Sequence, residues 1–208
     1  MVTVNRVESG MLDGDIGYII VYDFSGDCDE KFETAVNELV AAGAKGLILD
    51  LRDNPGGWVE DGNHIADVFL DAGTLCYLEY RDGKREYYRT TAGKLDIPLV
   101  ILINENSAST SEIVTGCLME RADATVVGKK SFGKGIVQSV IPVGDEGAGM
   151  QMTVALYFTP NGNAVHKIGI TPHVEVDLAE GDNGMHNFGD LTDAQLAEAL
   201  RIIREKVK

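Results

Sequence analysis

The amino-acid sequence predicts an α/β fold with a mixed, largely parallel sheet core and flanking helices. Between residues 17 and 127, short apolar runs typical of buried strands alternate with segments whose apolar residues recur at helical spacing. This alternation favours parallel strands joined by helical crossovers, and hairpin-like strands later in the chain make the sheet mixed. The 208 residues, 44% of them hydrophobic, are enough for one well-filled core, so we expect a single domain.

Two strands and a helix are predicted in the first quarter of the chain. Gly17 to Phe24 (GYIIVYDF) and Gly46 to Leu51 (GLILDL) have the continuous apolar pattern of buried strands. Between them, Asp27 and Glu30 have the spacing of a capping box, and Gly43 is expected to end the helix that they begin.

A loop, a helix and a hairpin are predicted next. Residues 52 to 57 (RDNPGG) cannot form regular structure, because a proline and two glycines break it. The dipeptide Asp82-Gly83 lies between strand-like residues 75–80 and 85–91, which predicts a type I′ hairpin turn. The helix expected after the loop carries Ile65, Ala66, Val68 and Phe69.

The second half of the chain continues the alternation. A helix is expected to end near Glu120, and Thr192 with Gln195 has the spacing of a cap for a C-terminal amphipathic helix. Strands are expected at 99–103, 124–127, 136–143 and 150–158. We therefore divide the chain into an N-terminal lead-in (1–16), a core (17–180), and an acidic connection with the C-terminal helix (181–208).

Charge and cysteine content exclude several functions. The net charge of −15 repels phosphate backbones and anionic lipid, so we expect no nucleic-acid or membrane-surface binding. Cys28, Cys76 and Cys117 form no CxxC pair, which excludes a zinc knuckle or a disulfide framework. We expect three buried free thiols, with a single disulfide as the alternative. No secretory signal or membrane span is visible in the sequence.

The segment Asn106 to Glu112 (NSASTSE) is the strongest local indication of chemistry. It lies between a predicted buried strand and a helix, and helix N-termini present free N–H groups and a positive dipole end. A serine there can attack a carbonyl while nearby amides hold the developing oxyanion. Serines are also ordinary N-caps, so this segment alone does not assign a nucleophile.

Two glycine-rich segments add candidate groups. The paired glycines at the end of RDNPGG allow backbone amides to approach a ligand, although a tight turn explains them equally well. Residues 128–138 (GKKSFGKGIVQ) do not match a P-loop, because Gly133 is followed by Lys134 and Gly135. A lysine between two glycines can instead be drawn inward, where desolvation favours the neutral amine of a general base. Lys129 and Lys130 fit solvated surface residues better.

Histidine chemistry and metal binding find little support in the sequence. None of His64, His166, His173 and His186 has metal-ligand spacing with another His or Cys. No Gly-x-Ser-x-Gly elbow is present, although a Ser-His-Asp triad assembled in space stays open. We therefore interpret the histidines as surface residues and expect no metal and no cofactor.

Together the motifs resemble the C-terminal processing, or tail-specific, serine peptidases. The resemblance covers about residues 10 to 178 and implies a crotonase/ClpP-like ββα architecture and the hydrolysis of peptide bonds in proteins. The matching segments, in chain order, are Leu51 to Gly57, Val100 to Ile113, Gly128 to Gln138, Tyr157 to Gly162 and Gly169 to Pro172.

The resemblance implies a role for individual residues. The nucleophile is Ser109, and the general base is Lys134, 25 residues later. Gln138 corresponds to the glutamine that orients the lysine. The oxyanion hole is implied to combine the Thr110 amide with an amide from Gly56 or Gly57, and the resemblance does not decide between these two glycines.

Partners and compartment are also implied by the resemblance. We expect peptide or unfolded protein substrates and no nucleic acid, while a homo-oligomer stays open. Members of the family usually carry a PDZ-type module and a signal or membrane anchor ahead of the core. We therefore expect residues 17–180 to be the peptidase core without that module, and the natural protein to be extracytoplasmic.

Three functions are consistent with the sequence. The leading one is a serine endopeptidase that cleaves near protein C-termini through an acyl-enzyme. The second is a catalytically resting or inactive peptide-binding core, because a missing module could leave Ser109 and Lys134 misaligned. The third, from fold analogy alone, is a crotonase-like acyl-CoA enzyme.

Overall fold

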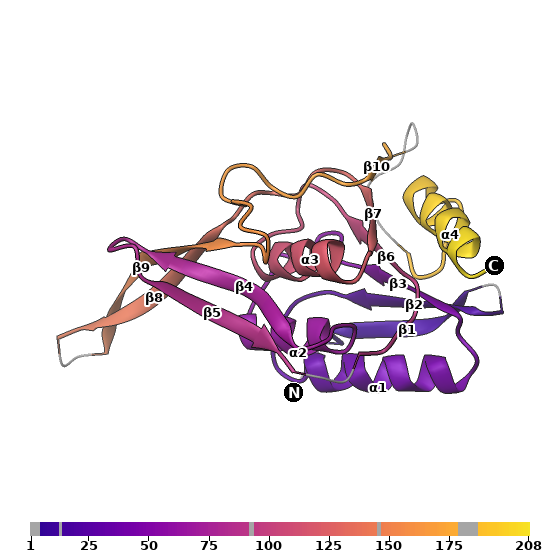
Figure 1. The fold of residues 1–208 in the computed structure, drawn as a ribbon, viewed down its shortest axis with the longest axis horizontal. Coiled ribbons are helices and arrows are strands. Elements are labelled where there is room, and N and C mark those ends of the chain that lie inside the picture. The colour runs from indigo at the N-terminus through magenta and orange to yellow at the C-terminus, as the bar shows by residue number, and fades with distance from the viewer. Residues whose placement is uncertain (1–4, 13, 92–93, 145–146, 179–186) are drawn as a thin grey trace.

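The larger β-sheet of the protein is mixed and largely parallel. The computed structural model describes residues 5–12, 14–91, 94–144, 147–178 and 187–208. Within them, the antiparallel pair β1–β2 is followed only by parallel pairs. The predicted fold class is therefore confirmed. In spatial order the strands are β1 (Val7–Leu12), β2 (Ile16–Val21), β3 (Gly46–Asp50), β6 (Leu99–Ile103), β7 (Thr125–Gly128) and β10 (Val174–Glu175) (Figure 1).

A second, antiparallel sheet is built from the later strands. They do not extend the parallel sheet, as a single mixed sheet would require, but form their own layer. The pair β8–β9 projects from the body of the molecule as a two-stranded ribbon (Figure 1). In spatial order the strands are β5 (Arg85–Thr90), β4 (Gly73–Tyr80), β9 (Ala148–Phe158) and β8 (Ile136–Val143).

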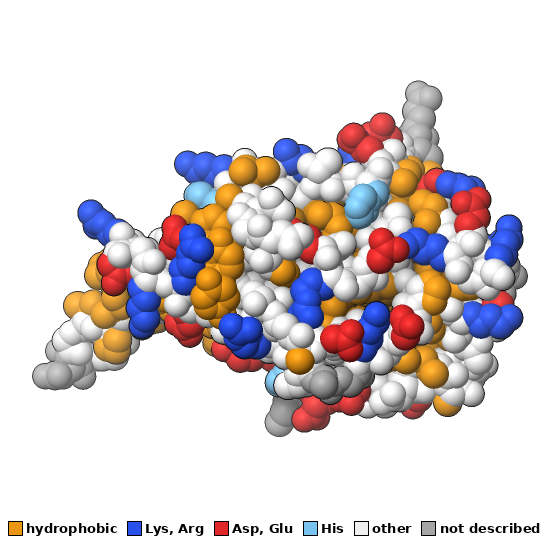
Figure 2. Space-filling model, viewed as in Figure 1, with side chains coloured by type: hydrophobic (Ala, Val, Ile, Leu, Met, Phe, Trp, Pro, Cys, Tyr) orange, Lys and Arg blue, Asp and Glu red, His pale blue; other side chains and the backbone are white. Residues whose placement is uncertain are grey.

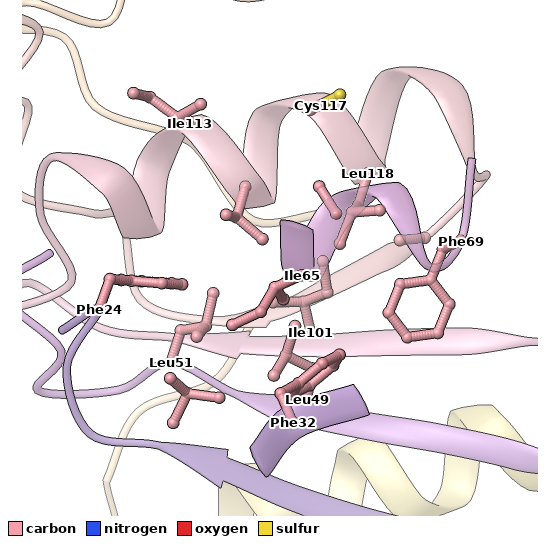
Figure 3. Close-up of a cluster of buried hydrophobic side chains, with 14 of the residues drawn as sticks. Phe24, Phe32, Leu49, Leu51, Ile65, Phe69, Ile101, Ile113, Cys117 and Leu118 are labelled. Carbon is pink, nitrogen blue, oxygen red and sulfur yellow. The ribbon is translucent and has the colours of Figure 1, made fainter. Parts of the chain in front are cut away.

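Helices cover both faces of the larger sheet. On one face, α1 (Cys28–Ala41), α2 (Val59–Asp67) and α3 (Thr110–Arg121) enclose a core that includes Leu49 and Ile101 (Figure 3). On the other, α4 (Ala194–Lys206) packs over a second cluster. Because both faces are buried, β3 and β6 are buried at every residue, and apart from Asp50 at the end of β3 they are apolar rather than alternating. Every helix in the described residues is too short or too polar to span a bilayer.

A strand lies within the residues expected to be only a lead-in. β1 runs antiparallel to β2, and only its end residues Val7 and Leu12 are buried. Its middle residues, Glu8 to Met11, are exposed or half-buried, so the segment lacks the apolar pattern that identifies a strand. The acidic stretch 180–190, expected as a connection, lies largely outside the described residues.

Three details of local structure differ from the prediction. Asp27 stands at the N-cap of α1, but its carboxylate caps no amide and pairs with Lys31 at 3.1 Å, so the capping box is wrong. The N-cap of α4 is Asp193 and not Thr192, because the Asp193 side chain accepts the amides of Gln195 and Leu196. In the hairpin only Gly83 has a positive φ (82°), whereas a type I′ turn needs one at both central residues.

The cysteines are free and buried, as predicted. Burial raises the pKa of Cys28, Cys76 and Cys117, each to about 12. At pH 8 the thiols are therefore both protonated and shielded from solvent, and only the thiolate is a nucleophile. The disulfide alternative does not occur.

We predict that a thiol reagent such as DTNB labels none of the three cysteines in the folded protein at pH 8. After unfolding in guanidinium chloride, three thiols per chain should react within minutes. Reaction of one thiol per folded chain would contradict this burial. A Cys28→Ser variant would then show whether Cys28 is the reactive residue.

Candidate active site

Two loops that follow neighbouring parallel strands form the candidate active site. The segment after β3 contains RDNPGG, and the segment after β6 contains NSASTSE. Since β3 and β6 pair in parallel, both loops leave the same edge of the sheet. Ligands bind outside the carboxyl ends of strands in open α/β folds. The structure therefore brings together two of the three segments singled out in the sequence.

Hydrogen bonds join these two loops directly. The Asn54 carbonyl accepts both the Ala108 amide at 3.0 Å and the Ser111 hydroxyl at 2.9 Å. The Thr110 hydroxyl donates to the Gly57 carbonyl at 2.9 Å. Ala108, Thr110 and Ser111 flank Ser109 in the sequence. These contacts therefore fix the backbone of Ser109 relative to residues 52–57, which we call the glycine loop.

Ser109 adopts a backbone conformation that is unusual for a residue with a side chain. It occupies the N-cap position of α3 with φ 57° and ψ −117°. Such a conformation costs about 1–3 kcal/mol and persists only where the surroundings impose it. A Cβ at Gly56 would lie 2.8 Å from the Ser109 Cβ and 2.9 Å from the Thr110 amide nitrogen. Glycine at position 56 therefore leaves open the space beside Ser109.

The buried carboxylate of Glu112 holds the third segment against the first two. Its Oε2 accepts the amides of Ser109 and Lys134, each at 2.9 Å. Its Oε1 accepts the Gly133 amide at 2.7 Å and the Ser131 hydroxyl at 2.5 Å. Glu112 is 1% exposed, so these four donors, together with the Tyr157 hydroxyl at 3.5 Å, satisfy a charge that burial alone would penalise. One carboxylate thus places the backbones of the candidate nucleophile and the candidate base side by side.

Sequence reasoning did not give Glu112 a role, although a signal for it was present. Ser109 and Glu112 have the S-x-x-E spacing of a capping box, in which the N3 carboxylate accepts the N-cap amide. The pattern predicts one of the five hydrogen bonds to this carboxylate. Three others come from residues 131–134 and the fifth from the Tyr157 hydroxyl, all of them remote in sequence.

Tyr157 on β9 supports the same arrangement. Its hydroxyl donates to the Ser109 carbonyl at 3.2 Å. Burial, and then the neighbouring Glu112 carboxylate, raise the pKa of Tyr157 well above its ordinary value. The phenol therefore stays protonated and remains a donor at physiological pH.

Backbone amides beside Ser109 differ in their availability. The Gly56 amide donates to the Asn54 side chain at 2.9 Å. Among the described residues, no acceptor lies at the amides of Gly57 and Thr110. Of the two glycines left open by the sequence, Gly57 therefore has the available amide.

The side chains of Lys134 and Gln138 are less closely tied than the backbone. Lys134 is half-buried, and no hydrogen bond joins its amine to Ser109 or Gln138 in the described part of the chain. Gln138 is exposed on β8, and its Oε1 accepts the Gln151 side chain at 3.2 Å. The structure thus brings Lys134 to the site through its backbone, while Gln138 lies four residues farther along on the ribbon.

The other lysines and the histidines lie away from this arrangement, with one exception. Lys130 is exposed, and Lys129 pairs with Glu175 at 2.9 Å, so both are surface residues. His64 and His173 are exposed, whereas His186 falls outside the described residues. His166 is half-buried rather than a surface residue, and its backbone packs against Gly135, next to Lys134.

The part of the chain that the structure describes contains no group of side chains suited to binding a metal ion. No three His, Cys, Asp or Glu residues gather there as a metal site would require. The groups that converge at the site are instead a hydroxyl, a half-buried amine and backbone amides. These groups suit nucleophilic attack on a carbonyl carbon.

We predict that Glu112→Gln lowers the free energy of unfolding by at least about 1.5 kcal/mol, since a hydrogen bond to a charged group contributes about 1.5–3 kcal/mol. The amide would offer one acceptor oxygen where the carboxylate offers two. Chemical denaturation followed by circular dichroism measures the change. Glu105→Gln, at an exposed glutamate in the loop that precedes α3, is the matched control. Equal stability of the two variants would contradict the inferred role of Glu112.

The chain is similar to proteases over most of its length. It matches peptidase family S41 over residues 15–176. A carboxyl-terminal-processing protease of Synechocystis sp. is 38% identical over 192 residues, which cover 90% of this chain and 44% of that protein. The carboxy-terminal processing protease CtpA of Bacillus subtilis is 36% identical over 181 residues, which cover 86% of this chain and 39% of that protein. The chain therefore spans less than half the length of these relatives.

Solved structures agree with the sequence relationship. A photosystem II D1 C-terminal processing protease superposes with a TM-score of 0.80 at 29% identity, over 97% of this chain and 53% of that one. A lipoprotein from Streptococcus agalactiae superposes with a TM-score of 0.75 over 98% of this chain and 71% of that one, and at 19% identity it shows the fold alone. The match to the family over more than half of the sequence, together with these relatives, shows that the chain belongs to peptidase family S41.

Proposed function

We propose that the chain is the catalytic core of a serine endopeptidase that cleaves near the C-termini of protein substrates with a Ser–Lys dyad. The observation that carries the proposal is the strained backbone of Ser109, held beside the free amides of Gly57 and Thr110. Strain of this kind gathers at functional sites, where the surrounding structure imposes it. An ordinary N-cap needs neither a positive φ nor a facing glycine.

Each group has one task in the proposed reaction. The amine of Lys134 accepts the proton of the Ser109 hydroxyl as the Ser109 oxygen bonds to the substrate carbonyl carbon. The amides of Gly57 and Thr110 donate to the oxyanion of the tetrahedral intermediate. Collapse breaks the C–N bond, and the Lys134 ammonium returns the proton to the leaving amine. Water, deprotonated by the same amine, then hydrolyses the acyl-enzyme ester and frees Ser109.

The edge of the smaller sheet suits the binding of an extended peptide. β8 is an edge strand that begins two residues after Lys134, so its free side leads away from the candidate site. Peptides add to such edges through main-chain hydrogen bonds. β8 and β9 hold no charged residue, and their exposed apolar side chains lie on the ribbon at the left of Figure 2. These are Val140, Ile141, Val143, Met150, Met152 and Leu156.

The substrate and compartment follow from the relatives as proposals. The relatives are named carboxyl-terminal-processing proteases and include bacterial and chloroplastic proteins. We infer that this chain acts on C-terminal segments of unfolded or extended proteins and that the natural protein works outside the cytoplasm. Because the chain spans less than half of those relatives, capture of the substrate is expected to involve parts beyond the core.

We predict that Ser109→Ala and Lys134→Ala each lower cleavage of an unfolded protein substrate by at least about 10³-fold, the scale on which serine peptidases lose activity without their nucleophile or base. A fluorophosphonate probe should label the wild type and Ser139→Ala but not Ser109→Ala. Lys130→Ala, an exposed lysine, should keep its activity. A wild type that binds peptide without labelling would indicate a non-catalytic core, and coenzyme A binding would indicate the acyl-CoA alternative.

We predict that Gln138→Ala lowers kcat about tenfold, because one orienting hydrogen bond to the Lys134 amine contributes about 0.5–1.5 kcal/mol. Gln151→Ala is the matched control, since it removes the neighbour that Gln138 now contacts and leaves Gln138 free to turn. Steady-state kinetics on one peptide would measure both. The same kcat in both variants and the wild type would remove Gln138 from the mechanism.

A further inference from the structure

A buried arginine begins the glycine loop of the candidate site. Arg52 lies two residues after the end of β3, and its side chain is 1% exposed. Its Nη2 donates to Asp50 Oδ2 at 2.6 Å, within the same turn of chain. Its Nη1 donates to Asp193 Oδ2 at 2.5 Å and to Gln195 Oε1 at 3.1 Å. Two of the partners of this guanidinium therefore come from the start of α4, more than 140 residues away in sequence.

These contacts balance a charge that has no access to water. A buried cation needs paired carboxylates and satisfied donors, and the loss of one partner leaves an uncompensated charge inside the protein. Asp50 already accepts the Tyr18 hydroxyl at 2.7 Å, so it shares its charge with a second donor. Asp193 supplies the other negative charge, and burial of both side chains makes the position of Arg52 dependent on α4.

Arg52 is also close in sequence to the amide that we assign to the oxyanion hole. Gly57 lies five positions after Arg52 in the sequence. The loop between them is stiff, because Asp53 has φ 58° and the Asn54 side chain accepts the Gly56 amide. A shift of Arg52 would therefore pass along the loop to the amides beside Ser109 rather than being absorbed by it.

The start of α4 is itself anchored on two sides. Asp193 Oδ1 caps the helix by accepting the amides of Gln195 at 2.9 Å and Leu196 at 3.2 Å. The Gln195 side chain donates to the Val176 carbonyl at 2.9 Å, just beyond β10. α4 lies on the face of the sheet opposite to α3, away from Ser109 (Figure 1). The match to the peptidase family ends at residue 176 and does not include α4.

We propose that Asp193 and Gln195 are positioning residues for the active site. They hold Arg52 so that residues 53–57 present the Gly57 amide beside Ser109. The C-terminal helix thereby supports the oxyanion hole from the far face of the sheet. This inference rests on the proposed peptidase function, because it assigns a task to the loop only if that amide stabilises an oxyanion.

The Asp193→Asn variant tests the ion pair with Arg52 while the cap of α4 is kept. Asparagine caps helices as well as aspartate, so the variant keeps the cap of α4 and removes only the charge that faces Arg52. We expect kcat and the rate of Ser109 labelling by a fluorophosphonate to fall about 10- to 100-fold, the effect of a small misplacement of catalytic groups. KM for the same peptide should stay within about twofold, since the substrate-binding edge is not involved.

A rescue variant and a control on the same helix sharpen the test. Asp193→Asn combined with Gln195→Glu moves the carboxylate to the other acceptor of the same Arg52 nitrogen but removes the hydrogen bond from residue 195 to the Val176 carbonyl, so part and not all of the lost kcat should return. Glu198→Gln removes an exposed pair with Arg201 on α4 and should leave kcat unchanged. Rates are compared per folded molecule, well below the unfolding transition of each variant.

Amide hydrogen exchange tests the same inference without a measurement of enzyme activity. In Asp193→Asn, the hydrogen-bonded amides of Asp53, Asn54 and Gly56 should exchange at least about fivefold faster, while those of β1 and β2 keep their protection. Unchanged exchange in the loop, or an Asp193→Asn variant with wild-type kcat, would overturn the positioning role. A wild type that neither labels nor cleaves would instead refute the proposed peptidase function, and the exchange result would still decide whether α4 holds the loop.

Discussion

Five hydrogen-bond donors converge on the buried carboxylate of Glu112, and the arrangement of the candidate site depends on it. Its two oxygens accept groups from the helix start at Ser109 and from residues 131–134, which no strand pairing joins. A charge buried in this way is stable only with all of its partners present. The same requirement that satisfies the carboxylate therefore sets the distance between the backbones of the candidate nucleophile and the candidate base.

A second buried charge performs a similar task on the opposite face of the sheet. Arg52 links the end of β3 to the first turn of α4, in the same way as Glu112 links α3 to residues 131–134. In both places, a charged group is enclosed because its hydrogen bonds join segments that are distant in sequence. The two faces of the parallel sheet thus contribute one internal anchor each, and the glycine loop runs between them.

Sequence reasoning predicted most of the fold and the segments that build the site. Buried strands such as β3 and β6 are continuous apolar runs, and RDNPGG must be a loop, so both are recognisable locally. The sequence pattern does not indicate β1, because only its end residues are buried, and it places the cap of α4 one residue too early. The roles of Ser109, Lys134 and Gln138 came from resemblance to a family. The resemblance itself is confirmed by the match to peptidase family S41, whereas the individual roles stay predictions.

The sequence alone determined the types of element, their order, the family and the glycine, serine and lysine segments, because each is written in residues that are close together along the chain. Only the tertiary structure decided which amides beside Ser109 are free. It also decided that Glu112 joins the start of α3 to residues 131–134 and that the later strands form a separate sheet. The contact of Arg52 with the start of α4 was likewise decided by the tertiary structure. These features depend on hydrogen bonds and burial between residues up to 143 positions apart, and no local pattern encodes such a contact.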